Sequence, residues 1–384
     1  MRDSFSRKHS QMRITLLLGS GCSLKAGMPS TNEITSKVRS GEGIMRHSDT
    51  VYHFMRNALP DKRNEQVLLL TNALFSEIES YYNERRSHPV NYENCCYLAT
   101  QLRDAESGEF DNAAVQPLIE RLTQKKELRT LMATREDRRS LFEETDNYIR
   151  DVVWGMLNRT PANVQHLWLA DMVRDKSFAS IDLVTLNHDT VLEQAFTSNS
   201  VTFCDGFGEA VNGVRFWQAD RLQDSNRIRL IKLHGSIDWF RFRAKNAIGI
   251  QEEHDSSEGR IADLTDPRPE LLVGTFNKML EYTTGIFADL HCHFHRCLRQ
   301  TRLLVCCGYG FGDKGINTKL SEWINAGPDR RLVVVHADPD QLFCCSRGAI
   351  ADHWPAWQRQ GKLVLVKKWN EDVSLDEIKQ ALLP

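Results

Sequence analysis

Two kinds of apolar pattern alternate along the chain. Short, nearly continuous apolar runs bounded by turn residues occur at 14–18, 181–186, 228–233, 302–307, 332–335 and 362–366. Such runs predict buried strands, because a strand covered on both faces carries apolar side chains on both. Apolar residues at helical spacing separate several of the runs, for example over 191–196, 318–326 and 375–383. This alternation predicts an α/β fold, a Rossmann-like parallel sheet with helices on both faces.

A long central region has helical spacing instead of strand runs. Leu74, Ile78 and Tyr81 recur at this spacing, as do Val152 and Met156. We therefore predict a large all-helical insertion at 51–175, which divides a sheet domain into 13–50 and 176–384. A lid, a partner surface and plain scaffolding all stay open as roles for it.

Glycines follow the first predicted strand. The run 14–18 ends in Gly19-Ser20-Gly21, and Ser30-Thr31 precede a helical pattern. Glycines let the backbone turn tightly and approach a ligand, and free N–H groups there can hold phosphate. The pattern predicts a strand, a phosphate-binding loop and a helix. The spacing is neither G-x-G-x-x-G nor a Walker A loop, so an ordinary turn is the alternative.

Polar residues follow four other predicted strands. They are Asn187-His188-Asp189, His234-Gly235-Ser236, Gly308-Tyr309-Gly310 and Asp338. In open parallel sheets, ligands bind outside the carboxyl ends of the strands. Taken singly, each group has an ordinary explanation, such as an Asp that caps the next helix. Together at one sheet edge they predict a binding site, where a carboxylate can accept both hydrogen bonds of a ribose hydroxyl pair. Within 272–278 an apolar run also ends in Gly-Thr, and for this stretch we favour a plain strand-to-helix turn over a place in the site.

Composition narrows the classes of function. The chain has 384 residues and a net charge of −2, which gives no argument for direct nucleic-acid binding. We expect no membrane span and no secretory signal, because long apolar runs are missing. Ten cysteines occur without a C-x-x-C pair, so we expect a reducing cytoplasm and no metal.

The order of these motifs resembles the sirtuin superfamily. The motifs are G-S-G-C-S, T-L-N-H-D, L-H-G-S and G-Y-G-x-x-D, followed by a strand that ends in an acid. They are most similar to bacterial sirtuin-like domains of antiviral defence systems, which act with an Argonaute-type protein or a HerA-type hexameric ATPase. The resemblance covers roughly 13–40 and 180–340 and excludes the helical insertion.

The resemblance implies a role for each motif. The first loop would cradle the pyrophosphate and ribose of NAD, which would be the substrate. Asn187 would position a water beside the nicotinamide ribose, Asp189 would hold the carboxamide, and His234 would be the catalytic histidine. Asp338 would approach the adenine-side ribose. The implied cofactor-binding residues are Gly19, Ser20, Gly21, Ser23, Thr185, Gly308, Gly310 and Asp338.

Three departures from the family pattern bear on the activity. Leu186 replaces a Gln, the family's G-T-S loop is Gly-Tyr-Gly, and the four-cysteine zinc module of protein deacylases is missing. The last departure disfavours deacylation and favours hydrolysis of NAD to ADP-ribose and nicotinamide. The resemblance implies an effector of bacterial anti-phage defence that a partner protein controls.

Other classes of function stay as alternatives. A non-catalytic NAD- or ADP-ribose-binding subunit of a larger assembly is the main one, followed by a protein deacylase and a nuclease. We expect a homo-oligomer. The sequence does not determine the oligomeric order, the partner, the trigger, or whether ADP-ribose is hydrolysed free or cyclised.

Overall fold

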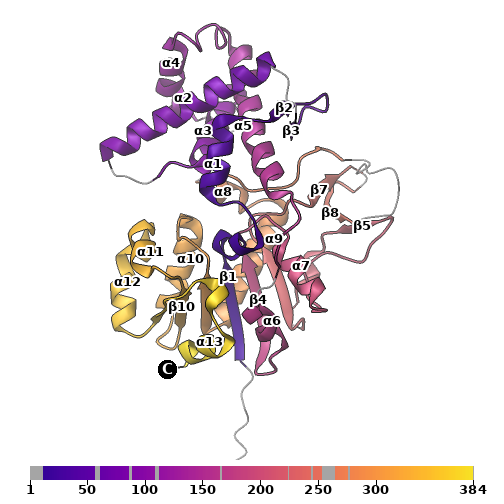
Figure 1. The fold of residues 1–384 in the computed structure, drawn as a ribbon, viewed down its shortest axis with the longest axis vertical. Coiled ribbons are helices and arrows are strands. Elements are labelled where there is room, and N and C mark those ends of the chain that lie inside the picture. Colours follow the sequence, from indigo (N-terminus) through magenta and orange to yellow (C-terminus); the bar gives the residue numbers. More distant parts are fainter. Residues whose placement is uncertain are drawn as a thin grey trace, which may run out of the picture.

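The computed structural model describes residues 12–56, 61–85, 89–108, 112–164, 167–223, 225–243, 245–252, 264–275 and 277–383. These residues form a sheet domain and, above it in Figure 1, a helical unit. The helical unit is inserted between the first and second strands of the sheet.

Six parallel strands form the centre of the sheet domain. The first strand, β1, lies in the interior and pairs with β4 on one side and β9 on the other. The sheet order is β11-β10-β9-β1-β4-β6. The predicted parallel sheet is thereby confirmed, and each apolar run corresponds to one strand. The strands are β1 (Met12–Leu18), β4 (Phe178–Thr185), β6 (Ile228–Lys232), β9 (Leu303–Cys307), β10 (Arg331–Val335) and β11 (Leu363–Val366).

Helices cover both faces of this sheet. Side chains alternate between the faces along each strand. Leu17 packs into a core with α9, α10 and α12, whereas Leu16 and Leu18 pack into a second core with α6, α7 and α13. The helices are α6 (Leu167–Arg174), α7 (Val191–Ser198), α9 (Gly285–Gln300), α10 (Lys314–Asn325), α11 (Pro339–Cys345), α12 (Ala349–Arg359) and α13 (Leu375–Leu382).

The helical unit has a core of its own. Val38, Leu70, Phe75 and Ile149 are fully buried in it. It also contains a two-stranded antiparallel hairpin, so the insertion is not all-helical as predicted. Three-residue strands are too short to show a period of two in the sequence. The elements are α1 (Thr31–Ser40), β2 (Ile44–Arg46), β3 (Tyr52–Phe54), α2 (Lys62–Arg85), α3 (Tyr92–Ser107), α4 (Gln116–Gln124) and α5 (Arg135–Leu157).

Packing crosses both predicted domain boundaries. Helix α1 precedes the predicted insertion but contacts α2, α3 and α5. Helix α6 lies inside the predicted insertion but packs on one face of the sheet, against β4 and α13. The division at residues 50 and 175 stays a prediction, and the hydrophobic cores favour limits near 30 and 160.

Strands that precede and follow β6 in the chain form a small antiparallel sheet that was not predicted. Its order is β5-β8-β7, with β5 (Val214–Phe216), β7 (Trp239–Phe242) and β8 (Ala247–Gln251). The chain after it returns towards the helical unit and leads into α8 (Asn277–Glu281).

Two partly buried ion pairs join the helical unit to this returning segment. Arg268 contacts both carboxylate oxygens of Asp151 on α5, at 2.8 and 3.0 Å. Lys278 on α8 pairs with Glu93 at the start of α3, at 2.8 Å. The side chains of Asp151 and Lys278 are 1% and 5% exposed. These contacts fix the helical unit over the carboxyl edge of the sheet.

Candidate functional site

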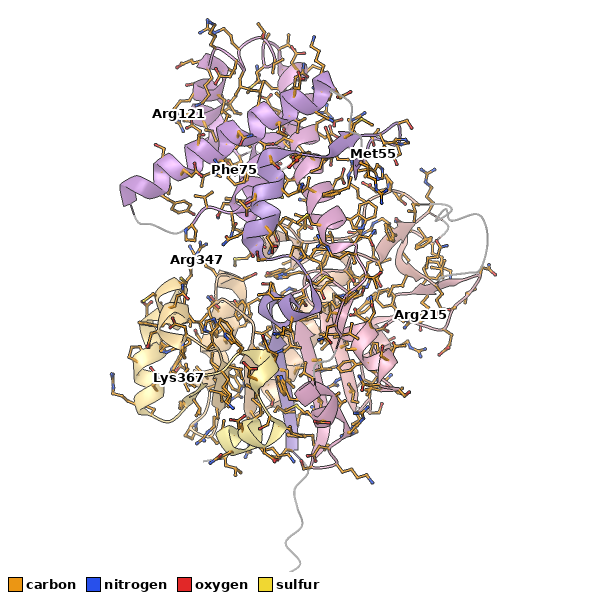
Figure 2. All side chains as sticks on the ribbon, viewed as in Figure 1. Met55, Phe75, Arg121, Arg215, Arg347 and Lys367 are labelled. Atoms are coloured by element: carbon orange, nitrogen blue, oxygen red, sulfur yellow. The ribbon has the colours of Figure 1, made fainter. Side chains whose placement is uncertain are left out.

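A cavity of about 730 Å³ lies between the carboxyl edge of the sheet and the helical unit. Loops after β1, β4, β6 and β9 form one side of it, and Tyr81, Tyr92 and Tyr97 of the helical unit contribute to the other. Arg121 on the helical unit and Arg347 on the sheet domain also line it (Figure 2). Its size is typical of a small-molecule site.

The loops after β1 and β9 cross in direct contact at three glycines. The amides of Gly19 and Gly21 donate to the carbonyls of Cys307 and Gly308, each at 3.0 Å. A Cβ on Gly19 would lie 2.5 Å from the Gly308 oxygen, and one on Gly308 would lie 2.4 Å from the Cys22 nitrogen. Gly308 also has a φ of +63°, which disfavours any side chain. Backbone alone therefore forms this part of the cavity surface.

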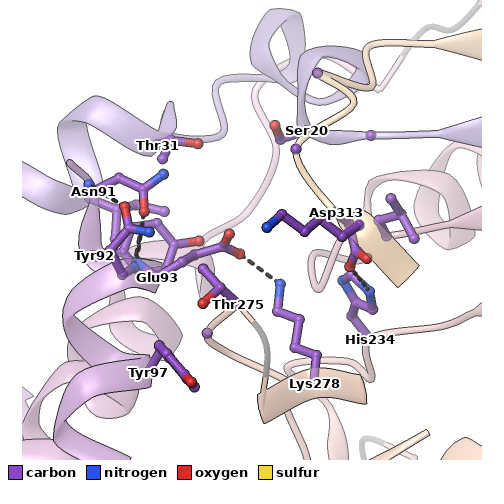
Figure 3. A pocket seen from close by; sticks show the side chains of 18 of the residues that line it. Ser20, Thr31, Asn91, Tyr92, Glu93, Tyr97, His234, Thr275, Lys278 and Asp313 are labelled. Atoms are coloured by element: carbon purple, nitrogen blue, oxygen red, sulfur yellow. Dashed lines mark hydrogen bonds and ion pairs between the residues drawn. The ribbon is translucent and has the colours of Figure 1, made fainter. Parts of the chain in front are cut away.

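The predicted helix after the glycine loop starts where the sequence placed it. Two short 3₁₀ turns, Ser20–Cys22 and Leu24–Ala26, separate it from β1. Helix α1 then begins at Thr31, with the Ser30 hydroxyl and the Glu33 carboxylate in a reciprocal capping box. Thr31 lines the cavity, so the start of α1 faces it (Figure 3).

Asn187 is fixed by two hydrogen bonds to the loop after β1. Its Nδ2 group donates to the Gly19 carbonyl at 3.1 Å and to the Ser23 hydroxyl at 2.9 Å. Both amide hydrogens are thereby used. The amide oxygen Oδ1 has no hydrogen-bond partner among the described residues, and the side chain lines the cavity. A fixed carbonyl of this kind can accept a hydrogen bond from a water or a hydroxyl.

Asp189 lines the cavity and precedes α7 by two residues. Its Oδ1 accepts the Val191 amide at 3.1 Å in an Asx-type turn, whereas Thr190 is the N-cap of α7. The backbone carbonyl of Asp189 accepts from the buried Lys232 ammonium at 2.6 Å, and that ammonium also pairs with Glu193. These contacts hold the loop after β4 rigidly.

His234 follows β6 and belongs to a buried group of three side chains, here called the His234 cluster. Its Nε2 lies 3.2 Å from Tyr282 Oη and 3.4 Å from Asp313 Oδ2. Tyr282 donates to Asp313 Oδ2 at 2.9 Å. The other oxygen of Asp313 accepts the Ile316 amide at 3.1 Å and so caps α10. The Tyr282 ring stacks on His234 and on His291, with centroids 6.2 and 3.6 Å away.

Burial and charge set the protonation of the His234 cluster. Burial lowers the pKa of His234 below its usual value, and the Lys278 ammonium lowers it further. Burial raises the pKa of Asp313, but the hydrogen bond from His234 and the Lys278 ammonium outweigh this and bring it well below its usual value. Burial, followed by the Asp313 carboxylate, raises the pKa of Tyr282. At neutral pH the cluster therefore holds a neutral imidazole, a phenol and a carboxylate.

The groups around this cluster come from both parts of the molecule. Glu93 of the helical unit reaches into the cavity and pairs with Lys278 from the opposite side (Figure 3). Burial lowers the pKa of both His188 and His291, so neither adds a positive charge at neutral pH. Lys278 is thus the cation that acts most directly on His234, and Glu93 holds it in place.

The structure brings most of the predicted site residues to one cavity, though not all of them. Gly19, Ser20, Ser23, Asn187, Asp189, His234, Gly308 and Gly310 line it, whereas Gly21, Thr185 and Asp338 do not. Thr185 accepts the Asn187 amide on its hydroxyl and so shapes the loop. Asp338 is exposed at the end of β10 and caps α11 through the Gln341 amide.

Sequence reasoning missed several residues that line the cavity. Gly274, Thr275 and Lys278 line the cavity, so the plain turn favoured for 272–278 was the wrong choice. Asp313 is the last residue of the G-Y-G-x-x-D motif, and that motif was the available signal for it. The wall from the helical unit, including Glu93, gave no signal, because helical spacing does not indicate which polar residues face a cavity.

The described part of the chain contains one cluster of potential metal ligands. This cluster, His47, Asp49 and His53, has three ligand atoms within 4.8 Å of one another. It lies in the β2–β3 hairpin, outside the cavity, and is explained by the 2.9 Å contact between His53 and Asp49. No described helix combines the length and the apolar character needed to cross a membrane.

Comparison with known proteins bears on the sheet domain. Residues 182–353 match the SIR2-like domain. The match contains Asn187, Asp189, His234 and Gly308, and it supports a place in the sirtuin-like superfamily. It does not extend to the glycine loop after β1 or to the helical unit. A search of curated proteins found no match.

Solved structures of sirtuins are similar only in outline. Two mutants of a Sir2 homologue in complex with ADP-ribose have 9% and 10% identity and TM-scores of 0.41 and 0.40. Each comparison covers 97% of this chain and 93% of the other. A structure titled as the basis for the mechanism and regulation of Sir2 enzymes has 10% identity and a TM-score of 0.40, over 97% and 94% of the two chains. At these values the SIR2-like domain match is the stronger finding.

Proposed function

We propose that the protein binds NAD in this cavity and hydrolyses it to ADP-ribose and nicotinamide. The observation that carries the proposal is the convergence of Asn187 Oδ1 and His234 on one cavity whose floor is the glycine crossing. The SIR2-like domain match at 182–353, which contains both side chains, supports NAD as the substrate.

The chemistry of NAD cleavage requires little from an acid. Nicotinamide is a cationic substituent that leaves as a neutral ring, so its departure needs no proton. The demanding step is to stabilise the ribose as it becomes oxocarbenium-like, as in other glycoside cleavages. Bare backbone at Gly19 and Gly308 lets the pyrophosphate approach closely, which would hold the ribose in a defined position.

Asn187 and His234 have separate roles in the attack on the ribose. The Asn187 carbonyl, fixed by its bonds to Gly19 and Ser23, orients the attacking water on the ribose. Neutral His234 takes a proton from that water or from a ribose hydroxyl. The Val191 amide binds Oδ1 of Asp189, so the other carboxylate oxygen can accept a hydrogen bond from the nicotinamide carboxamide.

The test measures binding and turnover separately in His234→Ala and Asn187→Ala. We expect each variant to lose more than ~10²-fold in NAD cleavage, since positioned proton transfer contributes at least this much. NAD affinity, measured by calorimetry, stays within about tenfold in His234→Ala because the glycine crossing is intact. Near-normal turnover in both variants would refute the assignment. NAD binding without turnover in the wild type would favour the non-catalytic subunit instead.

We also propose that the hydrolase is an effector of anti-phage defence, that a partner protein controls it, and that it assembles as a homo-oligomer in the cytoplasm. The resemblance to defence-type sirtuin-like domains supports this role, with a HerA-type ATPase or an Argonaute-type protein as the partner. Turnover measured with and without the protein that co-purifies from the native host tests it. Equal rates with and without that partner would contradict partner control.

A further inference from the structure

The hydrogen-bond pattern of the His234 cluster allows a single arrangement of its protons. Asp313 is ionised and can only accept, so the phenolic proton of Tyr282 is committed to Asp313 Oδ2, 2.9 Å away. The Tyr282 oxygen then has only lone pairs to offer to His234 Nε2, at 3.2 Å. Nε2 must therefore carry a proton and donate it.

The second nitrogen of His234 follows from this assignment. A neutral imidazole carries one proton, and here that proton is on Nε2. Nδ1 has no hydrogen-bond partner among the described residues, and the His234 side chain lines the cavity. Nδ1 is therefore the unprotonated nitrogen that is available to a substrate.

We propose that Asp313 holds His234 in the Nε2–H tautomer, with the Tyr282 hydroxyl as an intervening acceptor that Asp313 can replace, so that Nδ1 is the base that faces the cavity. Asp313 is then the positioning residue, and it does not need to touch the substrate. The tautomer is independent of the substrate, whereas the catalytic consequence rests on the proposed NAD hydrolysis.

The capping role of Asp313 makes Asp313→Asn a sharp test. Asn is as good an N-cap as Asp, and its amide oxygen is needed for the Ile316 amide. Its NH₂ group then replaces Oδ2 and donates to the Tyr282 oxygen. The phenolic proton becomes free to donate to His234 Nε2, which moves the imidazole proton to Nδ1 and removes the base.

Tyr282→Phe gives the opposite expectation from the same cluster. Without the phenol, Nε2–H can donate directly to Asp313 Oδ2, which lies 3.4 Å away. The Nε2–H tautomer persists, and the ring still stacks on His291. Asp61→Asn is a matched control, because Asp61 accepts the Arg63 and Asn64 amides at the start of α2, outside the cavity.

The experiment records ¹⁵N-histidine NMR spectra of the full chain, with the His234 signals assigned by their loss in His234→Ala. We expect Nε2–H in the wild type, in Tyr282→Phe and in Asp61→Asn, and Nδ1–H in Asp313→Asn. NAD cleavage should fall by more than ~10²-fold in Asp313→Asn and by less than about tenfold in the others. Nδ1–H in the wild type, or an unchanged tautomer in Asp313→Asn, would overturn the proposal.

These readouts separate the two proposals. A wild type that shows Nε2–H but no NAD turnover would refute the proposed function and leave the tautomer assignment intact. A wild type with normal NAD turnover but with Nδ1–H would refute the tautomer assignment and leave the proposed function intact. Should Asp313→Asn fail to fold, the wild-type spectrum still tests the proposal, because Nδ1–H in the wild type would overturn it.

Discussion

The glycine crossing gives a prediction that can be calculated from the structure. Gly308→Ala places a Cβ 2.4 Å from the Cys22 nitrogen and 2.7 Å from the Gly21 carbonyl carbon. All of these neighbours are backbone atoms, so the two loops must separate by about 1 Å to restore ordinary contact. The change therefore acts on the junction between β1 and β9, at the centre of the sheet.

Two contributions set the lower limit of the cost. A residue with a Cβ loses about 1–2 kcal/mol in the left-handed conformation that Gly308 adopts. Separation of the loops also removes the hydrogen bond from the Gly21 amide to the Gly308 carbonyl, at a net cost of about 1 kcal/mol. We expect Gly308→Ala to reduce the free energy of unfolding by about 2–3 kcal/mol or more.

Gly310→Ala is the matched control, two residues along the same loop. A Cβ there meets no atom within 4 Å, and Gly310 does not have a positive φ. The substitution should leave the stability unchanged or raise it by about 0.4–1 kcal/mol, because alanine restricts the unfolded chain. Urea unfolding followed by tryptophan fluorescence measures both variants. Equal stabilities of Gly308→Ala and the wild type, or an equal loss in Gly310→Ala, would refute the crossing as described.

Two other contacts give further predictions. Lys278→Met removes the ammonium that lowers the pKa of His234, so the pKa of His234 should rise. Because the neutral imidazole is the active form, the acidic limb of the kcat/KM profile for NAD should then move to higher pH. An unmoved or lowered limb would count against Lys278 as a neighbour of the base. Arg268→Ala leaves the Asp151 carboxylate buried without its guanidinium and should cost about 3–5 kcal/mol in thermal unfolding. Arg302→Ala, which breaks an exposed ion pair, should cost no more than about 1 kcal/mol, and equal losses would contradict the buried link.

The sheet and its polar edge were predictable because they depend on local patterns. Apolar runs locate β1, β4, β6 and β9, and parallel strands bring their carboxyl ends to one edge. That geometry alone places Asn187, His234 and Gly308 near one another. The roles of Thr185 and Asp338 were harder to predict, because a residue at a strand end can shape a loop or cap a helix without reaching the cavity.

Contacts across the insertion could not be read from the sequence. Lys278 and Glu93 are 185 residues apart, and their pairing depends on how the helical unit packs over the sheet. The spacing of apolar residues in α1 predicts a buried face but does not say whether the sheet or the helical unit covers it. The partnership of His234 with Tyr282 and Asp313 likewise depends on where α8 and α10 lie.

Release of nicotinamide from NAD by the purified chain tests the central claim most directly. The rate is measured for the wild type and for His234→Ala in parallel, alone and together with any partner that co-purifies from the native host. We predict equimolar nicotinamide and ADP-ribose from the wild type, with a rate more than ~10²-fold lower in His234→Ala. Bound NAD with no release of nicotinamide under either condition would contradict the account.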